Sequence, residues 1–206
     1  MKDVCIIADT HTRHREVVIP PCDLLIHCGD FCSFQRDDEA VLENVDMWFA
    51  ELPAKAVVCI GGNHDFLLQQ RAFPFANATV LEDTEIEVDG LRIYGSPWCP
   101  ELSGFAYYAT ESDLIGYWRK IPSGIDILVT HTPPYGILDC PTAGTPNLGC
   151  PHLRRELERI KPRLHVFGHI HASFGSQVDD STTYINAAVV AGRELLVRNP
   201  ASVVHL

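Results

Sequence analysis

Apolar residues in this chain are concentrated in short continuous runs, and each run ends at a glycine or a polar residue. Runs of this kind are typical of β-strands that are covered on both faces. They predict strands at Val4–Ala8, Asp23–Cys28, Ala56–Ile60, Ile125–Thr130 and Leu164–Phe167. Between the second and third runs, Asp37–Glu51 carries apolar residues at helical spacing before Pro53. This strand–helix–strand crossover makes the neighbouring strands parallel.

Shorter elements are predicted in the rest of the chain. Helices are expected at Phe66–Arg71, Glu111–Lys120 and Leu153–Ile160, and short strands at Ala78–Leu81, Glu85–Val88 and Leu91–Tyr94. Asp89-Gly90 is a strong hairpin signal between the last two strands. An antiparallel meander is expected in the tail, from Ser173–Val178, Thr182–Ala187 and Glu194–Val197. No repeat, low-complexity run or linker interrupts the pattern, which predicts a single domain over residues 1–206.

Two long segments without regular pattern are expected to be loops. Gly95–Tyr108 is rich in aromatic residues and should reach over the site. Its aromatic side chains could stack on a base or simply pack the loop down; they are Trp98, Phe105, Tyr107 and Tyr108. Thr132–Pro151 is the longer segment, and loops of that length inside a compact domain tend to be functional.

The polar residues that follow the five main strands are of types that bind metals or transfer protons. They are Asp9 and His11; Asp30; Asn63, His64 and Asp65; His131; and His169 and His171. Carboxyl ends of strands joined by crossover helices meet at one rim, so these side chains can share a cleft. A capping aspartate, a turn residue or a core histidine would explain any single one of them. Coincidence is a poor explanation for all five strand ends.

The spacing of residues within two of these motifs supports the idea that their side chains meet at one point. Asp9 and His11 are two residues apart, as are His169 and His171. In an extended segment such residues point to the same side. The adjacent glycines Gly61 and Gly62 let the backbone turn sharply before Asn63.

The donor types indicate a pair of cations. Carboxylate, amide oxygen and imidazole suit manganese, iron or zinc, and no cysteine is included in the set. A lone zinc ion needs only four ligands, whereas seven are available here: Asp9, His11, Asp30, Asn63, His131, His169 and His171. Two cations can hold a phosphoryl group between them.

Composition excludes several classes of protein. A formal net charge of −11 argues against a basic surface for long nucleic acids. The eight cysteines include no CxxC pair, and several lie in apolar runs, so we expect reduced core thiols. No signal peptide or membrane-spanning stretch is recognisable, so we expect a cytoplasmic protein that binds no membrane. The oligomeric state is left open.

The ordered motifs resemble those of the calcineurin-like metallophosphoesterases. D-x-H, G-D, G-N-H-D, H and G-H-x-H follow one another from Asp9 to His171. Further phrases resemble the MPPED-type phosphodiesterase branch; they are Asp9–His11, Gly29–Phe31, Ile93–Trp98, Gly124–Leu128, His165–Gly168 and Thr183–Ala187. One departure concerns residues 31–36, where the acidic or polar residue often found after G-D is not obvious.

This resemblance implies an α/β fold in which a two-sheet β-sandwich is flanked by helices, with the active site at the carboxyl ends of the strands. It implies one metal at Asp9, His11 and His171, a second at Asn63, His131 and His169, and Asp30 as the bridge. Some relatives in the branch lack the first histidine of G-H-x-H. Because His169 is present here, the second site should be complete.

The function expected from these residues is hydrolysis of small phosphodiesters, and the resemblance makes cyclic nucleotides the natural guess for the substrate. A metal-bound hydroxide would attack, His64 would protonate the leaving oxygen, and Asp65 would steady His64. Two divalent ions are the expected cofactors, manganese first and iron or zinc as alternatives. The alternative functions are a broad phosphomonoesterase or protein phosphatase, or a non-catalytic scaffold of the same fold. Arg13, His14 and Arg36 are either phosphate contacts or solvated surface residues.

Overall fold

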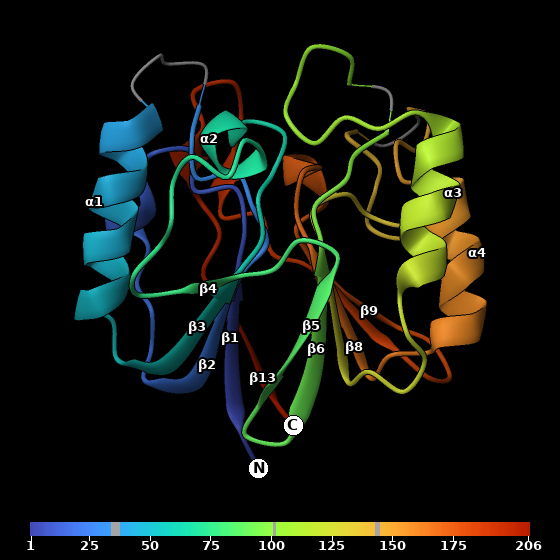
Figure 1. Ribbon diagram of the computed structural model, residues 1–206, viewed down its shortest axis with the longest axis horizontal. Helices are drawn as coiled ribbons and strands as arrows, with labels where there is room; N and C mark the ends of the chain where they lie inside the picture. The colour runs from blue at the N-terminus through green and yellow to red at the C-terminus, as the bar shows by residue number, and fades with distance from the viewer. Residues whose placement is uncertain (34–37, 101, 143–144) are drawn as a thin grey trace.

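Two β-sheets face each other and helices cover their outer sides (Figure 1). The computed structural model describes residues 1–33, 38–100, 102–142 and 145–206 of the chain. Arg36 and the first residue of the predicted helix Asp37–Glu51 lie outside the described residues.

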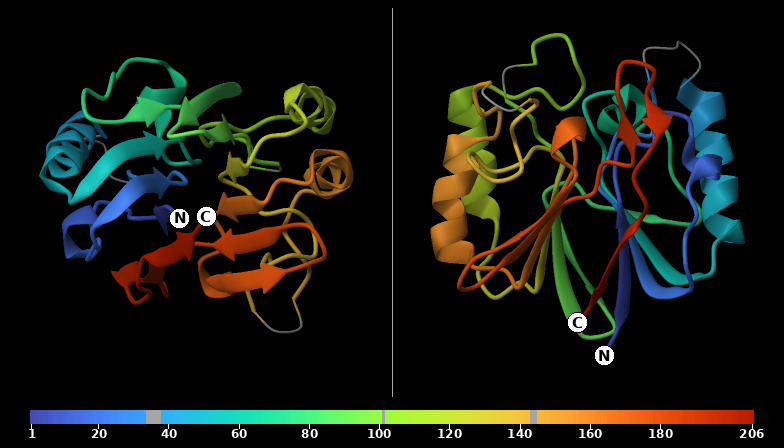
Figure 2. Two further views of the ribbon diagram at one scale, coloured as in Figure 1. Left: turned by 90° about the horizontal axis from the view of Figure 1, so that it is seen from below. Right: turned by 180° about the vertical axis from the view of Figure 1, so that it is seen from behind.

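The first sheet has the strand order β13-β1-β2-β3-β4. Its four parallel strands are β1 (Asp3–Ile7), β2 (Cys22–His27), β3 (Ala54–Cys59) and β4 (Thr79–Val80). The last strand, β13 (Ser202–His205), runs antiparallel to β1, so both termini lie at the same end of the molecule (Figure 2). The outer side of this sheet is packed by α1 (Asp38–Glu51), and a short helix, α2 (Phe66–Gln69), follows β3.

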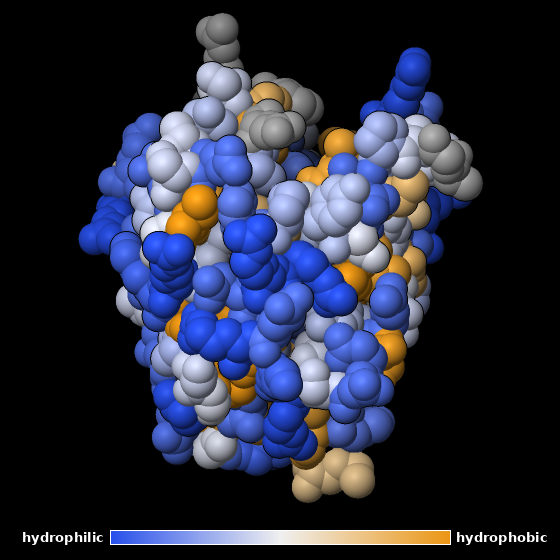
Figure 3. Space-filling view, turned by 90° about the vertical axis from the view of Figure 1, so that its right-hand side faces the viewer, coloured by the Kyte–Doolittle hydropathy of each residue, from blue (hydrophilic) through white to orange (hydrophobic). Residues whose placement is uncertain are grey.

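The second sheet has the order β5-β6-β7-β8-β10-β9. Its four inner strands are parallel: β6 (Leu91–Ser96), β7 (Ile127–Thr130), β8 (Leu164–Phe167) and β10 (Thr183–Asn186). The two edge strands are antiparallel to their neighbours: β5 (Thr84–Val88) and β9 (Gly175–Val178). Helices α3 (Glu111–Lys120) and α4 (Pro151–Ile160) pack on its outer side through Leu114, Trp118, Leu153 and Leu157. The surface that these two helices present to solvent is largely hydrophilic (Figure 3).

Burial on both faces explains the continuous apolar runs. In β1, Cys5 and Ile7 belong to the cluster under α1, whereas Val4 and Ile6 belong to the cluster between the two sheets. Alternate residues of a strand point to opposite faces, so a strand between two apolar layers needs apolar residues at every position. The predicted parallel arrangement of β1, β2 and β3 is confirmed.

The tail differs from the predicted meander. β9 and β10 do pair antiparallel, but β12 (Leu196–Val197) pairs with β11 (Val190–Ala191) in a separate two-stranded sheet. The reason is that β8 already occupies the other edge of β10, which leaves no free hydrogen-bonding edge for a third strand. The terminal strand β13 was not predicted, because Ser202–His205 is half exposed and too short to show a clear pattern.

Two short 3-10 helices, His14–Glu16 and His171–Ser173, follow the first and the last of the strands that lead into the site. Within the described ranges, no helix combines the length and the apolar character needed to cross a bilayer. All eight cysteines are free thiols, as the sequence predicted.

Candidate metal centre

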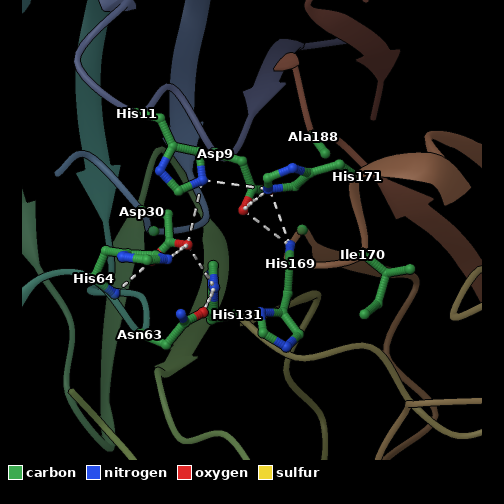
Figure 4. A network of polar contacts seen from close by, with 12 residues as sticks. Asp9, His11, Asp30, Asn63, His64, His131, His169, Ile170, His171 and Ala188 are labelled. Atoms are coloured by element: carbon green, nitrogen blue, oxygen red, sulfur yellow. Dashed lines mark hydrogen bonds and ion pairs between the residues drawn. The ribbon is translucent and has the colours of Figure 1, made fainter. Parts of the chain in front are cut away.

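The loops after β1, β2, β3, β7 and β8 converge at one edge of the two sheets, and the polar residues of these loops point toward one another (Figure 4). Strands from both sheets contribute: the first three belong to one sheet and the last two to the other. The predicted rim therefore exists, and it lies where the carboxyl ends of two parallel strand sets face each other.

Asp30 lies at the middle of this cluster. Its Oδ2 atom is 3.4 Å from His131 Nε2, 3.6 Å from His11 Nε2 and 4.0 Å from His64 Nε2. Its Oδ1 atom accepts a hydrogen bond of 2.9 Å from the His64 backbone N–H. The carboxylate is 2% exposed, so these groups replace solvent around it.

One side of the cluster contains Asp9, His11 and His171. The Nε2 atom of His171 is 3.3 Å from Asp9 Oδ1 and 3.3 Å from His11 Nε2. One ligand atom from each of these three residues lies within 4.8 Å of the other two, which is close enough for a shared ion. Asp9 is fully buried and also accepts the backbone N–H of His169 at 2.9 Å.

The other side contains Asn63, His131 and His169. The amide oxygen of Asn63 is 2.9 Å from His131 Nε2. The rings of His131 and His169 are 5.0 Å apart between centroids. Asp30 is adjacent to both sides, because its carboxylate contacts His11 on one and His131 on the other.

Hydrogen bonds on the far sides of two imidazole rings test whether this cluster fits a cation. The Nδ1 atoms of His11 and His131 lie 2.8 Å from the carbonyl oxygens of Cys32 and Cys28. A carbonyl only accepts, so each Nδ1 carries a proton and each Nε2 atom is directed into the cluster. The Nε2 atom of His131 then faces two oxygen acceptors, from Asn63 and Asp30. Lone pairs directed at one point in this way require a proton or a metal ion between them.

The pKa values of the site reflect the contacts between the Asp30 carboxylate and the imidazole rings around it. Burial alone would raise the pKa of Asp30, but His131, His11 and His64 hold it well below its ordinary value. Burial alone would lower the pKa of His131, but Asp30 raises it to about 9. His169 differs, because burial lowers its pKa to about 4 and the neighbouring His131 adds to the effect. Its ring is therefore a neutral donor at ordinary pH.

Glycine is required at two points where the backbone approaches a carboxylate. A Cβ atom at Gly62 would collide with the Asp30 carboxylate and the His131 ring. One at Gly168 would collide with the Asp9 carboxylate. The glycines that precede Asn63 and His169 thus leave space for the carboxylates of the opposite loops.

The residues of the cluster do not lie in extended backbone, although the spacing within D-x-H and G-H-x-H was expected to act through extended segments. Asp9, His11, Asp30 and His169 all have positive φ angles, of 55°, 41°, 60° and 69°. Non-glycine residues are uncommon in this left-handed region and are concentrated at functional sites. The paired side chains of D-x-H and G-H-x-H therefore meet because the chain turns sharply after each strand.

The carboxylate of Asp65 binds backbone groups of two loops. Its carboxylate accepts backbone N–H groups from Gly62, Asp30, Phe31 and Cys32 at 2.8 to 3.0 Å. It is fully buried, and burial followed by the neighbouring Asp30 raises its pKa to about 7. Asp65 therefore joins the loop after β2 to the loop after β3, and its hydrogen bonds within the described residues hold the backbone near His64.

Aromatic residues of the Gly95–Tyr108 segment pack this loop down over the site. The Trp98 ring stacks on Tyr117 at 4.0 Å between centroids and donates its N–H to Asp83. Tyr107 is buried and lies against Gly61, and Phe105 packs edge-on against His64. Of the two roles considered for these aromatics, Trp98 and Tyr107 have the packing role.

The candidate phosphate contacts near the amino terminus do not join the cluster. Arg13 forms an ion pair with Glu16 at 2.9 Å, and His14 contacts Asn44 at 2.7 Å. Arg36, the third candidate, lies outside the described residues.

One residue near the centre was missed by the sequence reasoning. Cys99 follows β6, and its Sγ atom groups with one ring nitrogen each of His131 and His169 within 4.8 Å. The expected ligand set contains no cysteine, and the structure adds this thiol to the groups that lie within reach of an ion. The available signal was its position beyond the carboxyl end of β6, which is the parallel neighbour of β7.

Comparisons with known proteins identify one family. A family model described as calcineurin-like phosphoesterase matches residues 3–173. Human metallophosphoesterase domain-containing protein 1 is 36% identical over an aligned region that covers 90% of this chain but only 65% of the relative. A UPF0046 protein of Caenorhabditis elegans is 34% identical. The aligned region covers 91% of this chain and 69% of that protein.

Solved structures show the same fold at low identity. The TT1561 protein of Thermus thermophilus matches with a TM-score of 0.56 at 13% identity, over 90% of this chain and 88% of that chain. Another solved structure matches with a TM-score of 0.65 at 16% identity, over 90% of this chain and 90% of that chain.

Replacing Asp30 by asparagine should reduce the metal content of the protein. The amide lacks the negative charge that all three surrounding imidazoles face, and both sides of the cluster use this carboxylate. We expect fewer than two divalent ions per chain after dialysis against manganese or zinc, measured by plasma mass spectrometry. Asp89→Asn, in the distant β5–β6 turn, is the matched control. Two ions retained by Asp30→Asn would contradict a shared carboxylate.

Metal affinity should rise with pH. Below the pKa of about 9 that Asp30 gives to His131, the metal-free ring carries a proton that a cation must displace. For one displaced proton, the apparent affinity should increase by up to about tenfold per pH unit and level off above about pH 9. Calorimetric titration between about pH 6 and about pH 9 measures this slope. A flat profile would show that no such proton competes.

Proposed function

Since the chain belongs to the calcineurin-like phosphoesterase family, we propose that it is a dinuclear-metal-dependent hydrolase of small phosphodiesters. One observation carries the proposal: two groups of candidate ligands share the buried carboxylate of Asp30. A site of this kind suits two cations a few ångströms apart, which is the arrangement used to cleave phosphoesters. The chain spans 65% of its human relative, so the proposal concerns this domain.

The proposed ligands follow the two sides of the cluster. Asp9, His11 and His171 would hold one ion, and Asn63, His131 and His169 the other, with Asp30 between them. Manganese is the first choice, with iron and zinc as alternatives, because all three accept imidazole with oxygen donors. When bound, such ions lower the pKa of water and neutralise charge on the phosphoryl group.

His64 is the proposed general acid. Its Nε2 atom lies 4.0 Å from Asp30 Oδ2, so the ring borders the cluster without occupying its centre. Burial lowers the pKa of His64, although Asp30 opposes this effect, and a protonated ring with a lowered pKa gives up its proton readily. Asp65 supports this position by holding the backbone of Gly62, two residues before His64, and of Asp30, whose carboxylate accepts the His64 N–H.

A neighbouring cavity supports a diester rather than a monoester. It has a volume of about 300 Å³ and reaches His169, and the other lining residues that the structure describes are uncharged: Pro100, Leu102, Tyr135, Asn147, Leu148, Gly149 and Pro151. A second ester group of modest size, such as a nucleoside, would find apolar surface and one amide there. Both long loops contribute to this cavity, which gives the Gly95–Tyr108 and Thr132–Pro151 segments a proposed role in substrate binding.

The complete ligand set argues against a non-catalytic scaffold, which has no need of His64, His169 and His171 around a buried carboxylate. The free thiols suit a reducing compartment, and we propose the cytoplasm.

The reaction is tested with paired aryl substrates. With manganese added, the purified protein should hydrolyse bis-aryl phosphate faster than mono-aryl phosphate. It should also hydrolyse 2′,3′- or 3′,5′-cyclic nucleotides. Release of the aryl alcohol is followed by absorbance, and cyclic nucleotides by chromatography. Faster turnover of monoesters would favour the phosphomonoesterase alternative, and no turnover of either would favour the scaffold.

Removal of His64 separates its role from metal binding. The alkoxide leaving group of an alkyl diester departs poorly without a proton, so His64→Ala should lower the turnover of alkyl diesters by roughly 10²–10⁴-fold. An activated aryl diester should lose far less, and the bound metal should stay near the wild-type level. His152→Ala, on α4, provides a control histidine. Equal losses for both substrates would count against general-acid catalysis by His64.

A further inference from the structure

Cys99 lies beside one half of the metal centre. Its Sγ atom and one ring nitrogen from each of His131 and His169 are within 4.8 Å of one another. These two histidines are also proposed ligands of one cation, together with Asn63. Cys99 is fully buried, so its thiol faces the two rings within the protein rather than in solvent.

The backbone around Cys99 is fixed at this position. Its N–H donates to the Tyr107 carbonyl at 2.9 Å, and its carbonyl accepts the Ala109 N–H at 3.1 Å. The same loop is tied to the centre itself, because the Ala106 N–H donates to the Asn63 carbonyl at 3.0 Å. The thiol is therefore held on the same rigid frame as the amide ligand, as a precise metal site requires.

Among the described residues, the thiol has one weak hydrogen-bond partner. It donates to the Pro97 carbonyl at 3.6 Å, which uses the S–H proton and leaves the sulfur lone pairs available. A cation that binds sulfur displaces this proton to solvent, because a coordinating thiol is deprotonated outright. Within the described residues, no other cysteine belongs to a group of potential metal ligands.

We propose that Cys99 supplies a thiolate ligand to the cation held by Asn63, His131 and His169. Sulfur beside two imidazoles favours borderline or soft ions such as zinc, iron or cobalt over manganese and magnesium. The thiol thus makes the two ion sites unequal: one has only imidazole and carboxylate donors, and the other adds sulfur. The inference deepens the proposed function, on whose metal centre it rests: at the second site, a zinc-like ion replaces manganese as the first choice.

Cobalt titration tests this assignment without any assay of activity. Sulfur bound to Co²⁺ produces an intense charge-transfer band in the near ultraviolet, whereas oxygen and nitrogen ligands give only weak visible bands. Wild-type protein titrated with Co²⁺ should develop this band until one of its two sites is filled. Cys99→Ser and Cys99→Ala should lose it while still binding Co²⁺. Cys140→Ser, which changes a thiol outside the cluster, should retain it.

Metal competition provides a second readout. Loss of the thiolate should lower the affinity of that site for Zn²⁺ by roughly tenfold or more, since even supporting groups around a metal contribute that much. The affinity for Mn²⁺ should change little. Zn²⁺ and Mn²⁺ titrations of wild-type and Cys99→Ser protein, with a chromophoric chelator as competitor, measure the ratio.

The outcomes separate this inference from the proposed function. Two bound Co²⁺ ions without a charge-transfer band would overturn the role of Cys99 and leave the metal centre intact. A band that persists in Cys99→Ala would assign it to another thiol and also overturn the proposal. Failure of wild-type protein to bind Co²⁺ or Mn²⁺ would overturn the centre itself. The wild-type spectrum decides the first point even if a Cys99 variant fails to fold.

Discussion

Two buried carboxylates surrounded by imidazoles are the interaction on which the rest of this structure depends. Asp9 and Asp30 are almost completely removed from water, and uncompensated charge in such a place is very costly. The surrounding rings of His11, His131 and His171 can compensate it only by carrying protons or by sharing cations. Because carbonyl groups fix the Nε2 lone pairs of His11 and His131 toward the carboxylates, a cation satisfies every group at once.

The fold provides this arrangement by placing the carboxyl ends of two parallel strand sets against each other. Three strands of one sheet and two of the other end at the same edge, and the loops after β1, β2 and β8 contain left-handed residues at Asp9, His11, Asp30 and His169. Gly62 and Gly168 allow close approach, and Asp65 joins two of the loops through four backbone hydrogen bonds. Asp65 thus holds two loops together, while its neighbour His64 lies at the border of the cluster.

Sequence reasoning located the elements whose signals are local. Continuous apolar runs predicted the buried strands, the Asp89-Gly90 pair predicted the β5–β6 hairpin, and polar residues after each strand predicted the cluster. What it missed depends on contacts distant in sequence. The pairing of β12 with β11 follows from β8 occupying the edge of β10, and Cys99 reaches the centre only because β6 lies beside β7. Likewise, the four amides around Asp65 come from two separate loops, and no pattern within either loop reveals them.

A crystal structure of the manganese- or zinc-loaded protein with anomalous diffraction tests the central claim most directly. The account predicts two anomalous peaks about 3.5–4 Å apart, one against Asp9, His11 and His171 and the other against Asn63, His131 and His169, with Asp30 touching both. A single peak, or peaks that avoid Asp30, would contradict it.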